Sequence, residues 1–492
     1  MGECSGWTAG LVVSGDGKNL VSHAGTAALR MLADQVGLTR NLSTVLAQPR
    51  LLVHDRGRVL VDLGVSIADG AEVISGIDAV GESSQLYGPV ASVSTTWRAL
   101  GEIAAAGQAG RRRIARAVAK TRAHVWDLIA GRHGELPPIR VADREITGMV
   151  GIRIDATLIT AHSEKELASP NWKKGFGFHP LLGYCDNTNE PLAQMLRTGR
   201  AGSNTAKDHL RILDEAIGAV PAKYRRRLLI SVDGAGASHD LIGHLDALAN
   251  RPGRQVWWTV GWDLGQRERT AITLVPEDVW QVAIDTAGEP RTSRDEAGEI
   301  VDAAQVADIT DLIRAGSSLT GWPTDMRILA RRERPHPGAQ LSLFEQHAGW
   351  RYQLTATNIA ARLPAGHANA AVVNNLAYLD ALARSHARVE DRIRTGKSCG
   401  LAKFPSHDFD RNTAWLDTAS IAQTLLAWFA HLSLDGDLAR AEPNTIRYRL
   451  LHVAARLTRG QRRRYLRIDQ TWPWTPDLVT AIRRIQALPA GP

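Results

Sequence analysis

Two short apolar segments that each end in an aspartate constrain the fold of this chain more than any other feature. Residues 228–232 read LLISV and lead into Asp233, and residues 150–154 read VGIRI and lead into Asp155. Such a segment is typical of a strand in an α/β sheet, which ends by presenting a polar side chain at its carboxyl edge. Two strands that each deliver an aspartate predict a shared site.

A third acidic residue stands on a long predicted helix, which the apolar spacing extends from about residue 369 to 395. Five side chains follow three- and four-residue spacing and so share one face: Ala383, His386, Glu390, Ile393 and Lys397. Glu390 and Lys397 are therefore stacked two turns apart. Together the three acids suggest a metal site that cuts and joins DNA.

The length and charge of the chain indicate several structural units and a polyanionic partner. The 492 residues exceed what one hydrophobic core usually supports, so two to four units are expected. The net charge is +8 and arginine is favoured over lysine. Guanidinium groups bind phosphates and release counterions, which favours nucleic acid as a partner. The alternative is a solvated basic surface that follows from an arginine-rich composition.

Cysteine usage and the absence of a long apolar stretch predict a cytoplasmic protein with access to the nucleoid. Cys4, Cys185 and Cys399 lack CxxC spacing, so neither a disulfide framework nor a zinc cluster is indicated. No stretch approaches the roughly 20 apolar residues of a membrane span. The first residues also lack a basic region followed by an apolar run, so no signal peptide is expected and the protein is predicted to act away from membranes.

Residues 1–142 are predicted to form a mainly helical N-terminal region, after a small strand near residues 11–13, and this region is a candidate to bind DNA. Two stretches of helical spacing flank Gly37, which is the layout of a helix-turn-helix. Two amphipathic helices around a glycine also occur in helical domains that bind no DNA. A basic helix at residues 111–129 follows, and there phosphate contact competes with simple solvation.

Residues 143–253 follow the order strand, hairpin, helix, strand. The hairpin spans residues 178–203 around a polar turn at residues 186–189, and a helix follows at residues 206–220. With aspartates on the first and last strands, this order is that of a ribonuclease-H-like core. The predicted fold class is thus α/β, with a mixed sheet that helices at residues 361–440 complete.

Two further units are expected outside that core. Residues 254–360 are strand-like and read as an inserted β-rich domain. Its tryptophans fit a sheet core, and the alternative is that one or two stack on bases near a cleavage point. Residues 441–492 are predicted to form a basic helical tail with the densest arginine cluster of the chain, where solvation and DNA contact are alternatives: Arg456, Arg459, Arg462, Arg463, Arg464 and Arg467.

In this order and spacing, the motifs resemble bacterial insertion-sequence transposases of the DDE type, in particular the DDE domain group 1. The resemblance covers nearly the whole chain. It rests on GIRIDATLITAHSEKE, KKGFGFHPLLGY, ISVDGAGA, RVEDRIRTGKSCGLAKFPS and the tail motif HVAARLTRGQRRRYLRI. The second acid follows the first by 78 positions and precedes the third by 157, which leaves room for the inserted β-rich unit.

The resemblance implies that Asp155, Asp233 and Glu390 form the catalytic triad and hold the metal. Lys397 matches the family's lysine seven residues after the glutamate and would grip a nearby phosphate. The family chemistry uses two Mg²⁺ or Mn²⁺ ions, about 3.5–4 Å apart, with Asp155 bridging them. Hard oxygen ligands suit these ions, and without metal the three acids would raise one another's pKa.

The match to the family's tyrosine, arginine, glutamate and lysine signature is partial. The arginine four residues before the glutamate and the tyrosine seven residues before it are here His386 and Ala383. Arg384, Arg388 or a protonated His386 are the candidates to replace the arginine. The departure removes no metal ligand.

The implied reaction frees 3′-hydroxyl ends at the terminal repeats and joins them to target DNA, which makes the protein an endonuclease and a strand transferase. Its partners would be double-stranded DNA, namely the target and the transposon ends that residues 1–142 would bind, and, in the DNA complex, a second copy of the chain. The residues predicted to contact DNA are Lys173, Lys174, Arg384, His386, Arg388, Arg394, Arg459, Arg462, Arg463 and Arg464. The alternatives are a stand-alone nuclease of the same fold and a DNA-binding regulator or decayed transposase without catalysis.

Overall fold

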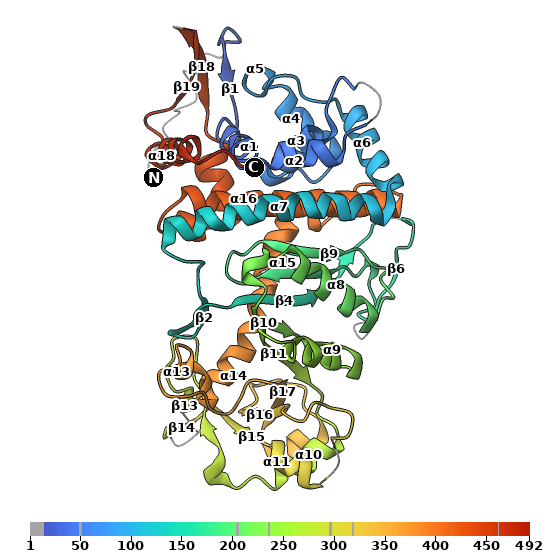
Figure 1. Ribbon diagram of the computed structural model, residues 1–492, viewed down its shortest axis with the longest axis vertical. Helices are drawn as coiled ribbons and strands as arrows, with labels where there is room; N and C mark the ends of the chain where they lie inside the picture. Colours follow the sequence, from blue (N-terminus) through green and yellow to red (C-terminus); the bar gives the residue numbers. More distant parts are fainter. Residues whose placement is uncertain are drawn as a thin grey trace, which may run out of the picture.

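The computed structural model describes residues 14–48, 52–162, 164–202, 206–234, 237–294, 298–316, 319–460 and 462–492. The strand predicted near residues 11–13 lies outside these ranges. Figure 1 shows a helical region at one end, two long helices across the middle, and a large sheet that runs to the other end. Within the described ranges, no helix combines the length and apolar character needed to cross a membrane.

A nine-stranded mixed sheet forms the centre of the molecule, and five adjacent strands make one half of it. In sheet order these are β9 (Pro191–Met195), β8 (Leu181–Cys185), β4 (Val150–Ala156), β10 (Arg227–Val232) and β11 (Gln255–Trp262). Strand β10 runs parallel to both β4 and β11, whereas β8 is antiparallel to β4 and β9. This order and these directions are those expected of a ribonuclease-H-like core.

The β8–β9 hairpin and the helix after it agree with the sequence. The turn between the strands covers residues 186–189, as the polar residues there predict. Helix α8 (Ala206–Ala219) buries Leu213 and Ile217 on one face, as the helical spacing indicates. The local sequence patterns therefore predicted the hairpin and helix α8 correctly.

The strands of the predicted inserted unit continue the same sheet. They are β17 (Arg351–Thr357), β16 (Arg327–Glu333), β15 (Ala304–Asp308) and β12 (Gln281–Val282), in this order from β11 outwards. Strand β17 is antiparallel to β11, with Thr357 opposite Thr259. The sheet is therefore unbroken at residue 254, where the sequence predicts a domain boundary. Among the tryptophans here, Trp257, Trp258 and Trp280 are buried, in keeping with a core role.

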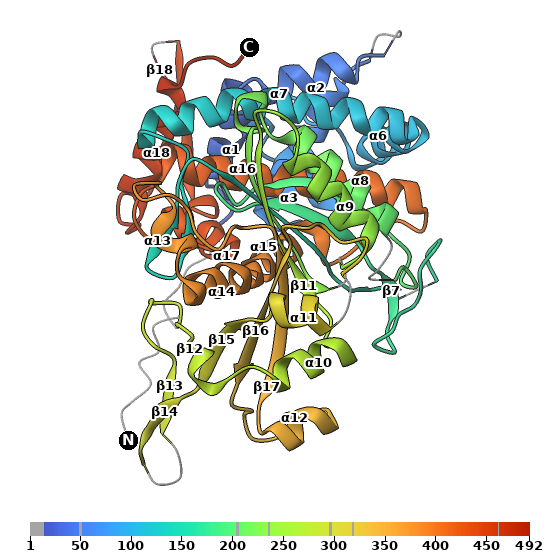
Figure 2. The ribbon, with the colours of Figure 1, turned by 60° about the horizontal axis from the view of Figure 1, so that its bottom comes forward.

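Helices cover both faces of the core sheet. A Cβ atom built at Gly183 of β8 would lie 3.4 Å from Ala216 of α8, so α8 covers that face. The next residue, Tyr184, points the opposite way and lies beneath α15 (Arg388–Gly396), since a Cβ at Gly396 would stand 3.1 Å from its Oη. In Figure 2 the small sheet of β5 (Ile159–Thr160), β7 (Phe176–Phe178) and β6 (Ser169–Pro170) projects to the side of this core.

The N-terminal region is mainly helical, as predicted, and packs onto the core through one long helix. It contains α1 (Thr26–Gln35), α2 (Leu38–Val45), α3 (Arg56–Asp69), α6 (Val93–Ala105) and α7 (Gly107–His133). Gly37 has a φ of 82° between α1 and α2, a left-handed turn that glycine favours. Helix α16 (Phe409–Ser433) packs against α3, α6 and α7, so this closing helix of the core also anchors the N-terminal region.

The prediction of a helix for the basic tail is wrong for its arginine cluster. Strands β18 (Ala455–Gly460) and β19 (Arg463–Ile468) pair as a hairpin, and β1 (Leu20–Val21) pairs with β18. The physical reason is an alternation of period two, in which Ala455 and Leu457 are buried and Arg456 between them is exposed. The tail then ends in a helix, α18 (Thr475–Ala487).

Candidate active site

Asp155 and Asp233 lie side by side at the carboxyl edge of the core sheet. In the parallel ladder between β4 and β10, Ile154 is the partner of Val232. Each aspartate is the next residue on its strand, so the register brings both to the same edge. Both side chains are partly buried. This arrangement agrees with the sequence-based expectation of a shared site.

Helix α15 brings Glu390 to the same edge from above the sheet. The helix approaches β8 and α16 closely at Gly396, where a Cβ would lie 2.6 Å from Gln423 Nε2. A larger residue there would have to displace the end of the Gln423 side chain. Glu390 stands in the first turn of α15 and is exposed.

The charges of Asp233 and Glu390 both act on Asp155. Burial and these two negative charges together raise the pKa of Asp155 to about 7. The backbone N–H of Ala156 donates to Asp155 Oδ1 at 2.7 Å and acts in the opposite direction. The mutual effect on the pKa that the sequence predicts for three acids without metal is therefore present at Asp155.

The three carboxylates are more widely spaced than a compact metal cluster. Among the described residues, one group of three metal-ligating side chains has all its ligand atoms within 4.8 Å of one another, and it consists of His23, Asp69 and His452. The family resemblance implies two ions that are both held by Asp155, with Asp233 holding one and Glu390 the other. In that arrangement Asp233 and Glu390 need not contact each other.

Two buried basic side chains near Asp233 were missed by sequence reasoning. Arg197 donates from Nε to the carbonyl oxygen of His179 at 2.9 Å, and its Nη2 has no hydrogen-bond partner among the described residues. Burial lowers the pKa of both side chains, and the charge of Asp233 acts on each in the opposite direction. The sequence signal was the pair of short motifs FHP and LRTGR at the two ends of the hairpin.

The helix predicted for residues 369–395 is broken, which corrects the sequence-based expectation. It consists of α13 (Ala370–Val373), α14 (Leu376–Arg384), a 3-10 turn η5 (Ser385–Ala387) and α15. The Asn375 side chain accepts hydrogen bonds from the backbone N–H groups of Ala377 and Tyr378 and so starts a new helix. A helix-capping asparagine is invisible to the apolar spacing that predicted one continuous helix.

A protonated His386, one of three candidates to replace the family's arginine, is contradicted. Burial and the nearby charge of Arg153 together lower the pKa of His386 to about 3. Arg153 pairs with Asp186 at 2.6 Å, and both are buried beneath the junction of α14 and α15. His386 is therefore neutral at physiological pH and cannot act as a cation.

The two arginines that flank His386 contact protein groups. Arg384 pairs with Asp380 at 2.8 Å and donates to the carbonyl oxygen of Ile284 at 2.6 Å. Arg388 donates to the carbonyl oxygen of Arg140 at 2.6 Å. Their roles at DNA stay predictions, as does that of His386.

Other predicted DNA contacts lie on the surface. Lys397 is exposed at the end of α15, and Arg394 pairs with Asp391 and Glu442. Lys173 and Lys174 are exposed on the turn between β6 and β7. The hairpin arginines are also exposed: Arg459, Arg462, Arg463 and Arg464.

An exposed tryptophan beside the two lysines was not singled out from the sequence. Trp172 is 70% exposed, and Lys173 Nζ lies 4.8 Å from the centre of its ring. Two residues separate strand β5 from β4, the strand that carries Asp155, and β5 pairs with β7 at the other side of this turn. The small sheet that bears the turn therefore continues from the end of β4. The motif NWKKG was the available signal, since aromatic and basic side chains together are typical of single-strand contacts.

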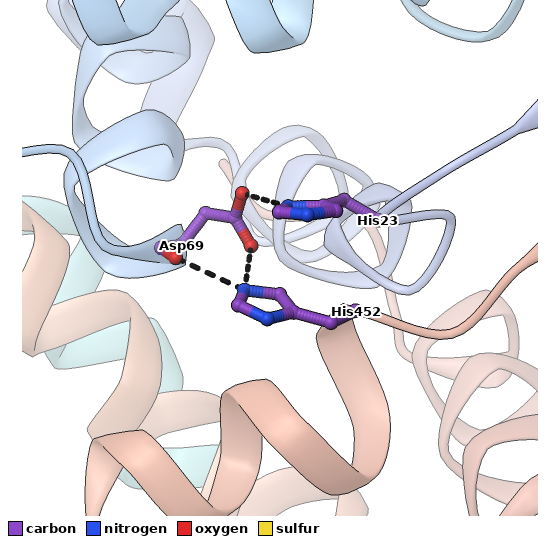
Figure 3. Close-up of side chains that lie close together, drawn as sticks. All are labelled: His23, Asp69 and His452. Atoms are coloured by element: carbon purple, nitrogen blue, oxygen red, sulfur yellow. Dashed lines mark hydrogen bonds and ion pairs between the residues drawn. The ribbon is translucent and has the colours of Figure 1, made fainter.

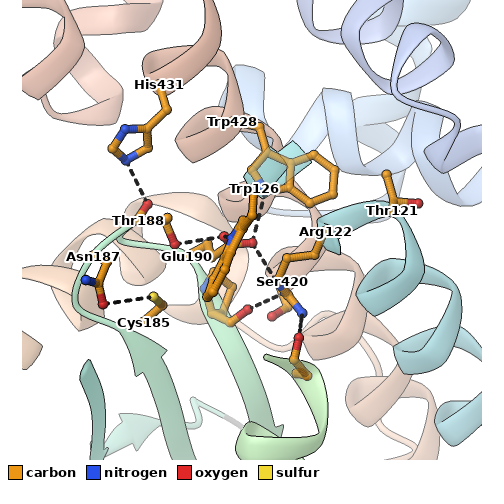
Figure 4. A network of polar contacts seen from close by, with 12 residues as sticks. Thr121, Arg122, Trp126, Cys185, Asn187, Thr188, Glu190, Ser420, Trp428 and His431 are labelled. Atoms are coloured by element: carbon orange, nitrogen blue, oxygen red, sulfur yellow. Dashed lines mark hydrogen bonds and ion pairs between the residues drawn. The ribbon is translucent and has the colours of Figure 1, made fainter. Parts of the chain in front are cut away.

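Two arginines of the basic helix α7 face the protein interior. Arg111 pairs with Asp417 of α16, and Arg122 Nε donates to Glu190 at 2.7 Å. Figure 4 shows Glu190 at the centre of a buried network. It accepts further hydrogen bonds from Trp126 Nε1 at 2.5 Å, Trp428 Nε1 at 3.0 Å and Thr188 Oγ1 at 2.8 Å. This network connects α7, the β8–β9 hairpin and α16. These two arginines of α7 therefore form internal ion pairs, a role different from the phosphate contact and the solvation that the sequence left as alternatives.

The mixed α/β core thus places two aspartates at the ends of adjacent parallel strands and a glutamate on a covering helix. Residues 7–490 match the family model described as Transposase DDE domain group 1. The chain therefore belongs to this family of transposases, as the sequence motifs predict.

Two further comparisons add little. A solved piggyBac transposase synaptic complex with hairpin DNA is similar at a TM-score of 0.36 and 11% sequence identity, over 87% of this chain and 80% of that chain. So low a similarity supports no conclusion about this chain. No curated protein matches the sequence significantly.

Proposed function

We propose that this transposase cleaves DNA at the terminal repeats of its element to free 3′-hydroxyl groups, and joins these groups to target DNA. Asp155, Asp233 and Glu390 would be its catalytic carboxylates. The observation that carries the proposal is the raised pKa of Asp155, which depends on burial and on the charges of the other two acids. Three like charges gathered at one sheet edge favour a bound cation.

The donor set fits Mg²⁺ or Mn²⁺. All three candidate ligands are carboxylates, and hard divalent cations prefer oxygen ligands. We propose two ions per site, held by Asp155, Asp233 and Glu390. When bound, such ions activate an attacking hydroxyl group and neutralise the charge that develops at the phosphate.

The protein's own groups would keep the carboxylates in position. The Ala156 N–H donates to one oxygen of Asp155, and the close backbone approach at Gly261 holds the Asp233 turn. The side chains of Gln423 and Tyr184 pack against helix α15 at Gly396. Lys397 would contact a phosphate near the reacting bond, since it follows Glu390 on the same helical segment. Since Asp155 must lose its proton to bind a cation, loading of the site would be favoured at neutral and higher pH.

The exposed basic groups would hold the DNA. We propose that the β18–β19 hairpin contacts the duplex through its arginines, and that Lys173 and Lys174, with Trp172, contact strands near the cleavage point. Because two ends are joined in one event, the acting unit would be a homodimer on DNA.

The test uses the purified full chain, Mg²⁺ or Mn²⁺, DNA with the element's terminal repeats, and a target plasmid. The repeats are identified from the DNA that flanks the coding sequence. We expect cleavage and joined product from the natural chain, and neither from Asp155→Ala, Asp233→Ala or Glu390→Ala. Binding to the repeats should persist in these variants, because none removes a basic group.

Asp391→Asn is the matched control. It removes an exposed acid adjacent to Glu390 that pairs with Arg394, and it should leave cleavage intact. Activity that survives any of the three alanine substitutions would contradict the assigned triad. Cleavage without joined product would favour a nuclease, and end binding without cleavage by the natural chain would favour a regulator.

A further inference from the structure

A cluster of two histidines and one aspartate lies apart from the three acids of the sheet. His23 stands between β1 and α1, Asp69 is the last residue of α3, and His452 follows the helical turn η8 (Arg447–Leu451). Figure 3 shows the Asp69 carboxylate beside the two imidazole rings, with a contact to each. His23 Nδ1 lies 2.6 Å from Asp69 Oδ2, and His452 Nε2 lies 3.0 Å from Asp69 Oδ1.

The three side chains offer their ligand atoms to one point. One nitrogen from each ring and one carboxylate oxygen all lie within 4.8 Å of one another. The two rings are stacked, with 4.0 Å between their centres and 23° between their planes. The stacking brings the two ring nitrogens to the same carboxylate, which is the arrangement a single ion requires.

Burial and a strained backbone single this cluster out from an ordinary surface ion pair. The Asp69 side chain is only 10% exposed. Its Oδ1 makes no hydrogen bond among the described residues; its contact is the ion pair with His452 Nε2, and that nitrogen also lies 3.2 Å from the Asp69 carbonyl oxygen. Burying a carboxylate without full compensation is costly. His23 has a φ of 52°, a left-handed conformation that is rare for a residue other than glycine. A cation bound between the three groups would compensate the buried negative charge.

The backbone around the cluster is fixed before any ion binds. The Ala24 N–H donates to the carbonyl oxygen of Val453 at 2.9 Å, and the Gly25 N–H donates to that of Leu451 at 3.1 Å. A Cβ atom at Gly25 would overlap the carbonyl oxygen of Leu450, so only glycine allows this approach. The segments that carry His23 and His452 are thus held side by side, and little ordering is needed to form the site.

We propose that His23, Asp69 and His452 bind one divalent transition-metal ion, for which Zn²⁺ fits best. Imidazole nitrogens with a carboxylate oxygen suit Zn²⁺, with water as the fourth ligand. This donor set differs from the all-carboxylate set at the sheet edge, which suits Mg²⁺ or Mn²⁺. The inference is independent of the proposed function.

The ion would fasten the arginine hairpin to the helical region. Strand β1 ends just before His23, and its partner strand β18 begins just after His452. An ion bound to both histidines and to Asp69 would therefore link the end of α3 to the base of the β18–β19 hairpin. That hairpin carries exposed Arg459 and Arg463. The proposed role is therefore structural, namely to fix the position of a basic surface.

The experiment measures Zn²⁺ content and thermal stability of the full chain. The protein is stripped with a chelator, incubated with Zn²⁺, dialysed and analysed by mass spectrometry for metal. We expect one Zn²⁺ per natural chain and a Tm that rises by several degrees with Zn²⁺. Both effects should be lost in His23→Ala, His452→Ala and Asp69→Asn.

Two control variants separate this site from others. His336→Ala removes an exposed histidine outside the cluster, and Asp155→Ala removes a candidate Mg²⁺ ligand. Both should bind one Zn²⁺ as the natural chain does, even if the proposed catalytic triad is wrong. Co²⁺ adds a second readout, since its visible absorption reports coordination by nitrogen and oxygen.

His452→Gln keeps the size of the side chain and guards against loss of folding in the alanine variants. Circular dichroism of the metal-free proteins checks that each variant folds. Equal Zn²⁺ content and equal Tm response in the natural chain and in folded His452→Gln would overturn the proposal. A natural chain that retains no Zn²⁺ after dialysis would overturn it as well.

Discussion

Gly261 of β11 packs directly against the backbone of Gly234, the residue after Asp233: a Cβ built at Gly261 would lie 2.5 Å from Gly234 N and 3.1 Å from the carbonyl carbon of Asp233. Real Cβ atoms do not approach main-chain atoms at the shorter of these distances. The strand beside β10 therefore determines where the Asp233 turn can lie.

Gly261→Ala should displace Asp233 and reduce DNA cleavage by about tenfold or more, since small misplacements of a reacting group are costly. The fold should persist, because only the turn at the sheet edge has to move. The measurement is the initial rate of cleavage in Mg²⁺. Gly243→Ala is the control, since a Cβ at this helical position of α9 (His239–Ala249) meets nothing within 4 Å. Equal rates for the two variants would contradict the assigned role of the turn.

Asp155→Asn should stabilise the metal-free protein above neutral pH while it abolishes cleavage. The pKa of Asp155 is raised to about 7, so the carboxyl group contributes stability at low pH that is lost as the pH rises through that value. Asparagine stays neutral and can still accept from the Ala156 N–H. We expect a Tm about 1–3 °C above that of the natural chain at pH 8.

This stabilising effect should disappear at acidic pH. At pH 4 the natural Asp155 is protonated, so the Tm difference between the two proteins should vanish. Differential scanning calorimetry in a chelator checks both conditions. A Tm difference that is the same at pH 4 and pH 8 would rule out the titration of Asp155 as its cause.

The double substitution Arg459→Ala/Arg463→Ala should weaken binding to the terminal repeats. These exposed arginines lie on the two strands of the β18–β19 hairpin. The binding constant falls as the salt concentration rises, and each phosphate contact that is lost makes the slope of log K against log salt shallower by about 0.9. The slope of the double variant should therefore be shallower by up to about two. Fluorescence anisotropy over a salt series measures it.

Arg140→Ala/Arg440→Ala removes the same charge from exposed positions elsewhere and serves as the control. Its salt slope should remain close to that of the natural chain. If both double variants lose the same affinity, net charge accounts for binding and the hairpin has no special role.

Glu190→Gln should strongly destabilise the protein. Glu190 is fully buried and accepts hydrogen bonds from Arg122, Trp126 and Trp428. Removing its charge leaves the guanidinium of Arg122 buried without compensation, which costs about 3–5 kcal/mol. Chemical denaturation measures the change in the free energy of unfolding.

Glu215→Gln tests the specificity of that effect. Glu215 pairs with Arg211 at a partly exposed position, where an ion pair contributes about 0–1 kcal/mol. A comparable loss of stability in the two variants would show that the buried network around Glu190 has no particular importance.

The sequence predicted the parts of the site that depend on local pattern. The two strands that end in Asp155 and Asp233, the hairpin turn at residues 186–189, and helix α8 are in the structure as expected. Each follows from a periodicity or from turn-forming residues that act over a few positions. The family motifs likewise lie in short segments, which is why membership in the transposase family was accessible from the sequence.

Other features depend on partners far away in the chain. The apolar spacing predicted one helix where Asn375 starts a second, and a helical tail where β1 pairs with β18. Strand pairing is decided by which edges meet in space, and β17 meets β11 across a predicted domain boundary.

The sequence by itself determined which residue types this protein offers for chemistry: three acids, many arginines and scattered histidines. Only the tertiary structure decided how each is used. Arg122 neutralises buried Glu190, and His386 is neutral because burial lowers its pKa. His23, Asp69 and His452 meet although they come from three separate segments. The physical reason is that the charge state and partners of a side chain depend on burial and on neighbours brought together by folding.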